Sequence, residues 1–269
     1  MSGKYAPAVD RRAFLRRSGL VAAGAAAGVA GTTGAEQLFE HDDTELSGHA
    51  VGDFRPAGLS AATIVYRWPT TEPVVALTLD DGPSAKYTSR VLDILEEKHV
   101  EATFFQMGKH VRAFPALAQR AAQRHEIGNH TWSHPSMALG RPPSVTRQLG
   151  RTAQVITHVT GRAPTLFRPP YGYFSGATAM VAAGMHYSIV LWDVKFNVTD
   201  SSTSNIERIA GQVVPGSIIL GHDGGTLNNE VVVQALPGLI DAVRQRGLRF
   251  ITVTQLLAAP TTSKAPSHL

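Results

Sequence analysis

Two pairs of polar residues in this 269-residue chain have the types and spacing that metal-assisted hydrolysis requires. Asp80 and Asp81 are adjacent and follow an apolar run, so the alternation of side chains along a strand points their carboxylates in different directions. One carboxylate can then bind a metal ion while the other remains free as a base. His130 and His134 are four residues apart, a spacing that brings two imidazoles to one face of a helical turn. Two imidazoles, one carboxylate and an open position make a catalytic zinc-type site.

The composition narrows what such a site can be. The chain has 11 histidines and no cysteine, which excludes disulfides, thiolate nucleophiles and Cys-based zinc sites. Any metal is therefore held by His, Asp or Glu. Each pair also has a non-catalytic interpretation, because Asp-Asp-Gly-Pro favours a solvated turn and exposed histidines can pair without a metal. Taken alone, the two pairs leave both interpretations open.

Further polar residues follow other apolar runs in the same way. Arg168 precedes two prolines, which stiffen the backbone beside a guanidinium that can position a carboxylate. Asp193 directly follows Trp192, and His222 ends another apolar run, where it can act as a general acid. The plainer alternatives are a structural salt bridge for Arg168 and a satisfied structural histidine for His222.

The elements that must position these residues alternate along the chain from about residue 73. Apolar runs predict strands at 74–79, 102–105, 126–129, 165–167, 187–194, 217–220 and 250–253. Amphipathic spacing predicts helices at 88–98, 114–124, 145–159, 178–183, 206–213 and 231–246. This alternation predicts a parallel α/β fold, and about seven repeats favour a distorted (β/α) barrel. The polar residues would then meet at the face formed by the carboxyl ends of the strands.

The first 35 residues are predicted to be a signal peptide. Paired arginines, Arg11 and Arg12, precede a weakly apolar run rich in Ala and Gly, which resembles a twin-arginine signal. Cleavage after Ala30 or Ala35 is compatible with the small residues there. We therefore expect an exported protein that is extracellular or associated with the cell wall.

The remaining chain is expected to form one domain with looser flanks. Residues 36–72 are interpreted as a linker or peripheral segment, 73–257 as the domain and 258–269 as a loose tail. The leader carries five of the 25 basic groups and one of the 21 acidic groups, so the rest of the chain is balanced in charge. This balance gives no electrostatic case for nucleic acid, and no apolar run is long enough for a membrane span. We expect the mature protein to be a monomer.

Four motifs occur in an order that resembles the polysaccharide deacetylase family, the NodB-homology or carbohydrate esterase family 4 enzymes. They are Thr78-Leu79-Asp80-Asp81-Gly82-Pro83, His130-Thr131-Trp132-Ser133-His134, Arg168-Pro169-Pro170-Tyr171-Gly172 and Leu220-Gly221-His222. The resemblance covers about residues 73–257. It implies a distorted (β/α) barrel with about seven strands and a divalent metal, most often Zn²⁺, with Co²⁺ or a similar ion as the alternative.

The resemblance also implies a role for each matching residue. The implied metal ligands are Asp81, His130 and His134. Asp80 would be the general base, held by Arg168, and His222 would be the general acid. The backbone N–H of Tyr171 would help to bind the oxyanion. The residues expected to contact substrate are Pro169, Tyr171, Trp192 and Leu220.

One motif departs from the family pattern. An Asp that partners the acid histidine is expected in an Asp-x-x-Asp-Trp segment, but Lys195 stands at the first Asp position. Asp193 or Asp200 is predicted to serve instead as the partner of His222. The departure concerns the substrate groove on that side and leaves the metal triad untouched.

The function that the resemblance implies is removal of N-acetyl groups from an N-acetylglucosamine-containing polysaccharide, peptidoglycan or a chitin-like polymer, by metal-activated water. Two alternatives stay open. The first is an esterase that removes O-acetyl groups from a polysaccharide such as xylan. The second is a non-catalytic carbohydrate-binding barrel, although such a protein has no need of a base, a ligand triad and an acid.

Overall fold

The central strand of the fold is β2 (Val74–Asp80), whose seven residues are all buried. The computed structural model describes residues 62–225 and 229–262, so the predicted leader, 1–35, lies outside the described residues. The run Val-Val-Ala-Leu-Thr-Leu-Asp is almost continuously apolar, as is typical of a parallel strand covered on both faces. β2 pairs in parallel with β3 (Thr103–Gln106) on one side and β8 (Ile218–His222) on the other.

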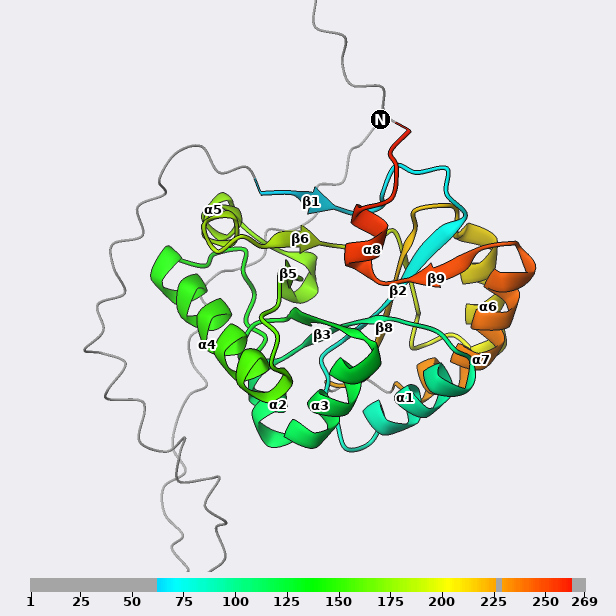
Figure 1. Cartoon of the computed structure of the whole chain (residues 1–269), viewed down its shortest axis with the longest axis horizontal. Helices are drawn as coiled ribbons and strands as arrows, with labels where there is room; N and C mark the ends of the chain where they lie inside the picture. Colours follow the sequence, from blue (N-terminus) through cyan, green and yellow to red (C-terminus); the bar gives the residue numbers. More distant parts are fainter. Residues whose placement is uncertain (1–61, 226–228, 263–269) are drawn as a thin grey trace, which may run out of the picture. The chain divides into compact units, whose positions relative to one another are not determined.

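The other strands extend this centre into one curled sheet (Figure 1). Its order is β1-β6-β5-β4-β3-β2-β8-β7, and β9 also pairs with β2. The remaining strands are β1 (Ile64–Val65), β4 (Glu126–Asn129), β5 (Leu166–Phe167), β6 (Ser188–Val190), β7 (Val194–Lys195) and β9 (Arg249–Ile251). Every strand pairing within the described ranges is parallel. The predicted distorted (β/α) barrel is thereby confirmed.

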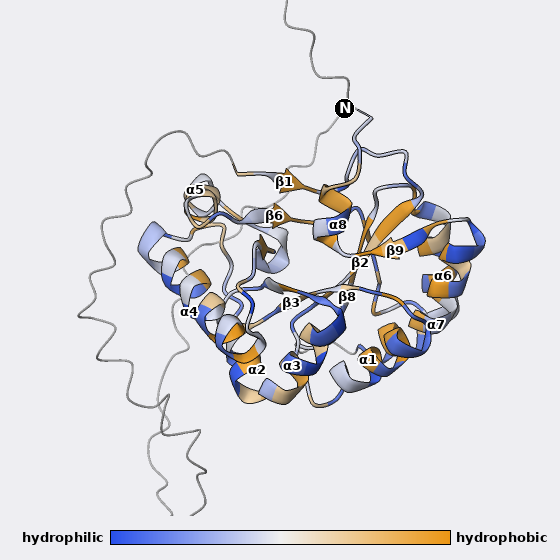
Figure 2. Ribbon diagram, in the orientation of Figure 1, coloured by the Kyte–Doolittle hydropathy of each residue, from blue (hydrophilic) through white to orange (hydrophobic). Residues whose placement is uncertain are grey.

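Helices cover the outside of the sheet and pack on it through apolar stripes. They are α1 (Thr88–Glu97), α2 (Gly108–Ala113), α3 (Pro115–Arg124), α4 (Pro142–Thr160), α5 (Gly176–Gly184), α6 (Ser202–Gln212), α7 (Glu230–Gln245) and α8 (Val253–Leu257). In α1, Val91, Leu92 and Leu95 are buried, while charged residues point outward. Figure 2 shows this division, with hydrophobic strands inside and mixed colouring on the helices. Each such buried side chain stabilises the fold by about 1.5–3 kcal/mol.

The predicted strand at 187–194 is wrong as a single element. The chain forms β6, leaves it at Leu191, and then forms β7. β6 pairs with β1 and β5, whereas β7 pairs with β8 at the other end of the sheet. The segment therefore joins the two ends of the curled sheet, and one continuous strand cannot hydrogen-bond to partners at both ends. The predicted strand at 250–253 is also shorter, because Thr252 caps α8 through a capping box with Gln255.

The domain extends beyond the predicted boundaries at 73 and 257. β1 belongs to the sheet although it precedes residue 73, and Trp68 lies within hydrogen-bond distance of the C-terminal segment. The Trp68 indole N–H donates to the Ala259 carbonyl at 2.9 Å, and the Thr262 N–H donates to the Pro69 carbonyl at 2.7 Å. These contacts tie both flanks to the barrel, a long-range pairing that local composition does not reveal.

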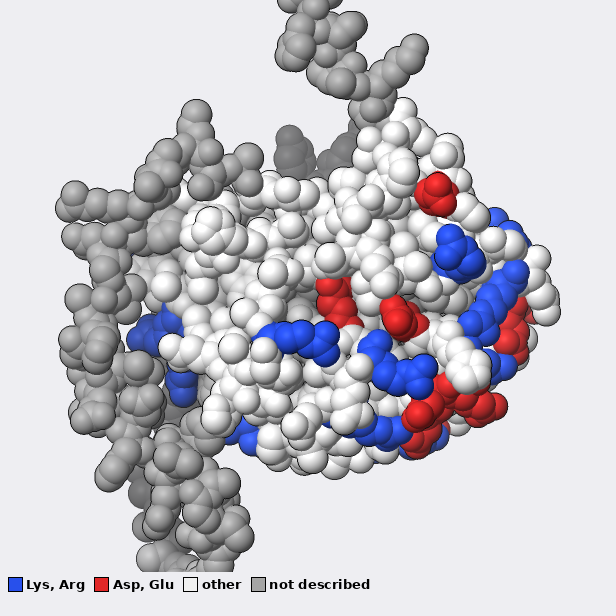
Figure 3. All heavy atoms as spheres, in the orientation of Figure 1, with Lys and Arg blue, Asp and Glu red and all other residues white. Residues whose placement is uncertain are grey.

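The surface charges form local pairs. Figure 3 shows acidic and basic side chains interleaved on the face in view. Arg120 contacts Asp93 at 2.6 Å, and Lys98 contacts Asp241 at 2.7 Å. Exposed pairs of this kind contribute only about 0–1 kcal/mol each, so the stability of the domain rests on its core. Within the described ranges, none of the helices is long and apolar enough to cross a membrane.

Burial of His125 predicts a pH-dependent stability. Burial lowers the pKa of His125 to about 4, assisted by the charges of Arg124 and Arg120. The unfolded chain takes up this proton near pH 6.5, so between about pH 6.5 and 4 the unfolded state binds more protons and stability falls as the pH falls. Protonation linked to His125 therefore lowers the free energy of unfolding by about 2 kcal/mol at pH 5 relative to pH 7.5.

Urea unfolding of a His125→Asn variant at these two pH values tests the prediction. Asn keeps an acceptor for the Ala102 N–H, which now donates to Nδ1 at 3.4 Å, but it does not titrate. Between pH 7.5 and pH 5, the free energy of unfolding should fall by about 2 kcal/mol less in the variant than in wild type. The exposed His99, changed to Asn, is the matched control and should behave as wild type. Equal acid sensitivity of wild type and His125→Asn would contradict the assignment.

Candidate active site

The acidic pair lies at the carboxyl end of β2. Asp80 is the last residue of the strand, and Asp81 follows it with a φ of 72°, in the left-handed region. Asp is one of the few residues that adopts this conformation readily. The direction of the Asp81 carboxylate is therefore set by this left-handed backbone as well as by the alternation of side chains along the strand. Both side chains are buried.

The histidine pair lies in the loop after β4, and the predicted helical turn is not formed. Thr131 and His134 have φ values of 66° and 63°, which fold the loop back on itself. The Asn129 amide oxygen accepts the Thr131 N–H at 3.0 Å, and the Thr131 hydroxyl accepts the His134 N–H at 3.1 Å. The two imidazole centroids are consequently 5.0 Å apart. These side-chain hydrogen bonds, instead of a helical turn, bring the two imidazoles together.

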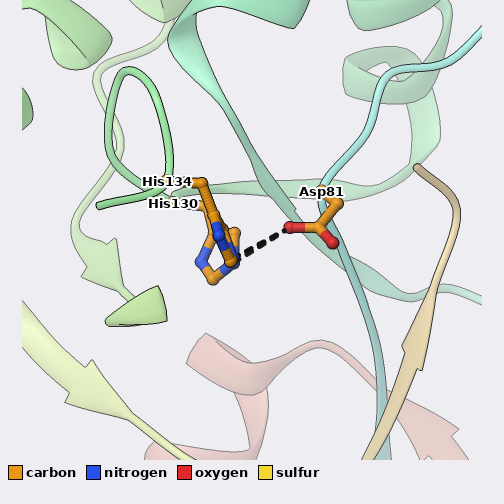
Figure 4. A group of neighbouring side chains, drawn as sticks. All are labelled: Asp81, His130 and His134. Atoms are coloured by element: carbon orange, nitrogen blue, oxygen red, sulfur yellow. Dashed lines mark ion pairs between the residues drawn. The ribbon is translucent and has the colours of Figure 1, made fainter. Parts of the chain in front are cut away.

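Asp81, His130 and His134 converge on one point (Figure 4). Nε2 of each histidine lies 3.3 Å from Asp81 Oδ1, and the candidate ligand atoms all lie within 4.8 Å of one another. Asp81 Oδ1 is buried without a hydrogen-bond partner among the described residues, an arrangement that a cation would satisfy. The Arg168 carbonyl lies 2.8 Å from Nδ1 of His130, which orients Nε2 toward Asp81. The set therefore fits a divalent metal with N and O ligands.

The protonation of the triad is set by its own charges. Burial raises the pKa of Asp81, but the close approach and charge of His130, with the charges of His222 and His134, outweigh that effect and bring the pKa to about 2. Burial lowers the pKa of His134. Burial also lowers the pKa of His130, but Asp80 and Asp81 reverse that effect and the net pKa is raised. A proton on His130 therefore competes with a metal, and metal affinity should weaken in acid.

Arg168 forms a buried ion pair with Asp80. Its guanidinium is fully buried and donates to Asp80 Oδ1 and to the Thr78 hydroxyl, both at 2.7 Å. It also donates to the carbonyls of Val190 and Leu191 at 3.0 and 2.9 Å. These bonds occupy one oxygen of Asp80 and leave Oδ2, 3.8 Å from His130 Nε2, available to accept a proton. The predicted pairing of Arg168 with Asp80 is present.

Tyr171 packs its ring against the triad. It lies in a short 3₁₀ turn, η3 (Pro170–Gly172), with a φ of 61°, and its ring contacts the His134 ring at 4.6 Å between centroids. No acceptor within the described ranges takes the Tyr171 N–H. Positive φ at a non-glycine residue costs about 1–3 kcal/mol and clusters at functional sites. Asp81, Thr131, His134 and Tyr171 share this feature.

His222 ends β8 in register with Asp80. Burial lowers the pKa of His222, and the charges of Asp80 and Asp81 oppose that effect. Asp193 is not its partner, because the Asp193 carboxylate accepts the Ile218 N–H at 2.7 Å at the start of the same strand. His222 is four residues farther on, roughly 13 Å along an extended chain.

Asp200 does not contact His222 either. Its carboxylate lies 3.5 Å from Nε of Arg208 and accepts a hydrogen bond from Asn197 at 2.9 Å. Both predicted partners of the acid histidine are therefore engaged elsewhere. The carboxylates that act on His222 are those of the acidic pair, which the linear sequence placed more than 140 residues away.

A cavity of about 1030 Å³ opens above these residues. Its lining includes Asp80, Asp81, His130, His134, Tyr171, Trp192, Leu220 and His222. Pro169, predicted to contact substrate, is buried and is not part of this lining. The expectation that polar residues at strand ends meet at one face is met by the aspartate pair, the histidines and the arginine loop.

Comparison with known proteins agrees with this geometry. The sequence pattern of the polysaccharide deacetylase family matches residues 67–190. A peptidoglycan-N-acetylglucosamine deacetylase from Bacillus cereus is 36% identical over 199 residues, which span 71% of this chain and 70% of the relative. This chain belongs to the polysaccharide deacetylase family.

Solved structures of the family share the fold. A peptidoglycan N-acetylglucosamine deacetylase in complex with a naphthyl-substituted N-hydroxybenzamide superposes with a TM-score of 0.71 at 31% identity, covering 74% of this chain and 95% of that one. A family 4 acetyl xylan esterase from Clostridium thermocellum, in complex with a cobalt ion, has a TM-score of 0.63 at 31% identity, covering 70% and 93%. The second structure is of a metal-bound member of the same family.

Asp223 is a buried residue of this deacetylase-family site to which sequence reasoning gave no role. Its backbone N–H donates to the Asp80 carbonyl at 3.1 Å, and its Oδ2 accepts the Thr88 hydroxyl at 2.6 Å. Burial raises the pKa of Asp223 to about 7, which the Thr88 hydrogen bond partly offsets. The only sequence signal was its position beside His222. Asp223 anchors the Gly224-Gly225 turn that packs against Asp81.

Gly225 controls the space around the Asp81 carboxylate. Its φ is +79°, and a Cβ there would lie 2.4 Å from Asp81 Oδ2. Gly225→Ala should therefore displace this carboxylate and weaken binding of a divalent metal by about ten-fold or more, measured by chelator competition. Gly161 is a matched control, because its φ is +74° but nothing lies within 4 Å of its Cβ position. Gly161→Ala should bind zinc as wild type does; equal effects of the two substitutions would refute the steric argument.

Proposed function

We propose that this chain is an exported, metal-dependent hydrolase that removes N-acetyl groups from an N-acetylglucosamine-containing polysaccharide, peptidoglycan or a chitin-like polymer. The observation that carries the proposal is the triad of Asp81, His130 and His134 beside a second carboxylate, Asp80, whose Oδ1 is held by Arg168. The N-acetylglucosamine deacetylase activity for which the Bacillus cereus relative and the superposed deacetylase are named supports the amide substrate.

The metal ligands would be Asp81, His130 and His134. When bound there, a divalent cation supplies Lewis acidity to the acetyl carbonyl and to water. Zn²⁺ is the proposed ion because two imidazoles and a carboxylate with an open position suit it, and Co²⁺ is the alternative. The cobalt ion in the Clostridium thermocellum relative supports a site that accepts such ions.

Asp80 is the proposed general base. Arg168 occupies Oδ1, so Oδ2 is the oxygen that takes the proton from the attacking water. The fixed hydrogen bonds of Arg168 keep the carboxylate from rotating away. Asp80 thus stays oriented toward the cavity without serving as a ligand.

Tyr171 is assigned to the oxyanion and His222 to the leaving group. The Tyr171 N–H, which has no acceptor within the described ranges, donates to the oxygen that gains charge as water attacks. His222 lies on the neighbouring strand to Asp80 and donates a proton to the leaving amine. Because burial lowers its pKa, His222 would receive this proton during turnover from Asp80, which takes it from the attacking water and pairs in register with His222.

Acetate release from paired substrates tests the proposal. Purified full-length protein is incubated with peptidoglycan glycan strands, with chitooligosaccharides and with acetylxylan, before and after EDTA treatment and Zn²⁺ addition. We expect acetate from the N-acetylated glycans, lost with EDTA and restored by zinc. Acetate from xylan alone would support the esterase alternative. Binding to glycan without any metal-dependent acetate release would support a non-catalytic binding protein.

Export is proposed from the leader, which lies outside the described residues. The paired Arg11 and Arg12 ahead of the Ala- and Gly-rich run favour a twin-arginine route to the cell wall or medium. Fusion of residues 1–35 to a reporter that folds in the cytoplasm, with Arg11→Lys and Arg12→Lys together as the test variant, measures the route. Export that survives the double substitution would overturn the twin-arginine assignment.

A further inference from the structure

The wall of the cavity on the β7 side is basic. Beyond the acidic pair and the histidines, the charged residues that line the cavity are Lys195 on β7 with Arg208 on α6 beside it, and Lys109 on α2. Within the described ranges, the only carboxylates that line the cavity are Asp80 and Asp81. Arg168 holds one of these, and the other is a proposed metal ligand. Neither is free to neutralise a cation at the opposite wall.

Of the two cations on the β7 side, Lys195 is the one whose charged group has no partner among the described residues. It is exposed on β7, and its ammonium makes no hydrogen bond or ion pair with any described residue. Arg208 is different, because its guanidinium contacts Asp200 at 3.5 Å and donates to Asn205 at 2.8 Å. Arg208 also donates to the Lys195 carbonyl at 3.0 Å, which fixes the backbone from which the lysine side chain projects.

The position of Lys195 relative to the chemistry follows from strand register. Lys195 pairs with Leu220, and His222 lies two residues farther along β8, roughly 7 Å at 3.3 Å per residue. This separation is between backbone positions, and the Lys195 side chain projects from its own position into the lining of the cavity. A glycan that extends from His222 along this wall therefore passes the lysine.

Exposed aromatic side chains lie at and beside the cavity. Tyr171 and Tyr173 are 60% and 63% exposed, and their ring centroids lie 6.5 Å apart. Exposed aromatic faces of this kind pack against the apolar faces of sugar rings. The cavity lining therefore offers an aromatic ring at Tyr171 and a positive charge at Lys195.

We propose that Lys195 binds a carboxylate carried by the sugar next to the residue that is deacetylated. The inference rests on the proposed function and deepens it. Lys195 would then favour an anionic glycan over neutral chitin. Peptidoglycan is such a glycan, because its N-acetylglucosamine alternates with a sugar that bears a lactyl carboxylate. A Lys–carboxylate hydrogen bond in a partly enclosed cavity changes KM by roughly three- to ten-fold.

The test compares one glycan in two charge states. Peptide-free peptidoglycan strands are used with their lactyl carboxylates free or converted to neutral methyl esters, and acetate release gives kcat and KM for each. Wild type should have a roughly three- to ten-fold lower KM for the free carboxylate. The ratio should shrink toward one at high salt, because screening weakens a charge pair of this exposure.

Three variants locate the effect. Lys195→Met should remove the preference, bringing the ratio of kcat/KM for the two substrates to about one, and Lys195→Glu should reverse it. Lys86→Met removes an exposed lysine outside the cavity and should keep the wild-type ratio. The kcat/KM ratio for the two substrates is compared within each variant. A general loss of activity in Lys195→Glu would therefore not imitate a reversed ratio.

The outcomes separate this inference from the proposed function. Acetate release by wild type at equal KM from both charge states overturns the role of Lys195 and leaves deacetylation standing. A preference that persists in Lys195→Met also overturns it. If wild type releases no acetate from any N-acetylated glycan, the proposed function itself is wrong.

Discussion

Replacing His130 by alanine is expected to abolish zinc binding and acetate release together, with kcat/KM falling at least about a thousand-fold. The imidazole is buried, its Nε2 lies 3.3 Å from Asp81 Oδ1, and its Nδ1 contacts the Arg168 carbonyl at 2.8 Å. Removing it takes one of the three residues from the candidate ligand group of Asp81, His130 and His134. Metal content by mass spectrometry and acetate release on the same preparation measure both effects.

The matched control is His158→Ala. His158 is exposed on α4, where alanine suits the helix, and it is not among the residues lining the cavity. Metal content and activity should equal those of wild type. If His130→Ala kept its zinc but lost activity, His130 would be a catalytic group instead of a ligand. Activity that survived in His130→Ala would refute the triad.

Replacing Arg168 by methionine is expected to cost about 3–5 kcal/mol of stability as well as activity. The guanidinium is fully buried, so its loss leaves the Asp80 carboxylate without its 2.7 Å partner inside the barrel. The carbonyls of Val190 and Leu191 also lose a donor. Thr78 is affected less, because its hydroxyl still donates to the Ile219 carbonyl at 2.7 Å. Urea unfolding at neutral pH measures the change in the free energy of unfolding.

A double variant separates the structural from the catalytic part of this effect. Arg168→Met combined with Asp80→Asn removes the unpaired charge, so about half or more of the lost stability should return. Activity should not return, because the proposed base is gone. A loss below about 1 kcal/mol in Arg168→Met alone would mean that water or a shifted side chain replaces the arginine.

Much of the barrel was predictable because local patterns determine it. The run in β2 is apolar throughout, and the stripe in α1 recurs at helical spacing, so each segment has one favourable way to bury its side chains. The short strands were harder to define. β6 and β7 hold only three and two residues, and their separation depends on which end of the sheet each one meets.

The site was predictable in its residues and less so in its conformation. Strand ends carrying Asp80, Asp81 and His222 were visible in the sequence, since apolar runs stop there. The loop of His130 and His134 was not, because spacing alone cannot distinguish a helical turn from a folded loop. Hydrogen bonds from Asn129 and Thr131 determine that choice.

The sequence by itself determined the alternation of strands and helices, the residue types at the strand ends and the absence of thiolate chemistry. Tertiary structure alone decided which of those residues meet. It moved Asp193 away from His222, placed Asp80 in register with it, and brought Lys195 into the wall of the cavity. The physical reason is that local burial and propensity act within a few residues. Strand register and strained backbones such as that of Asp81 are stabilised only by contacts between segments far apart in the chain.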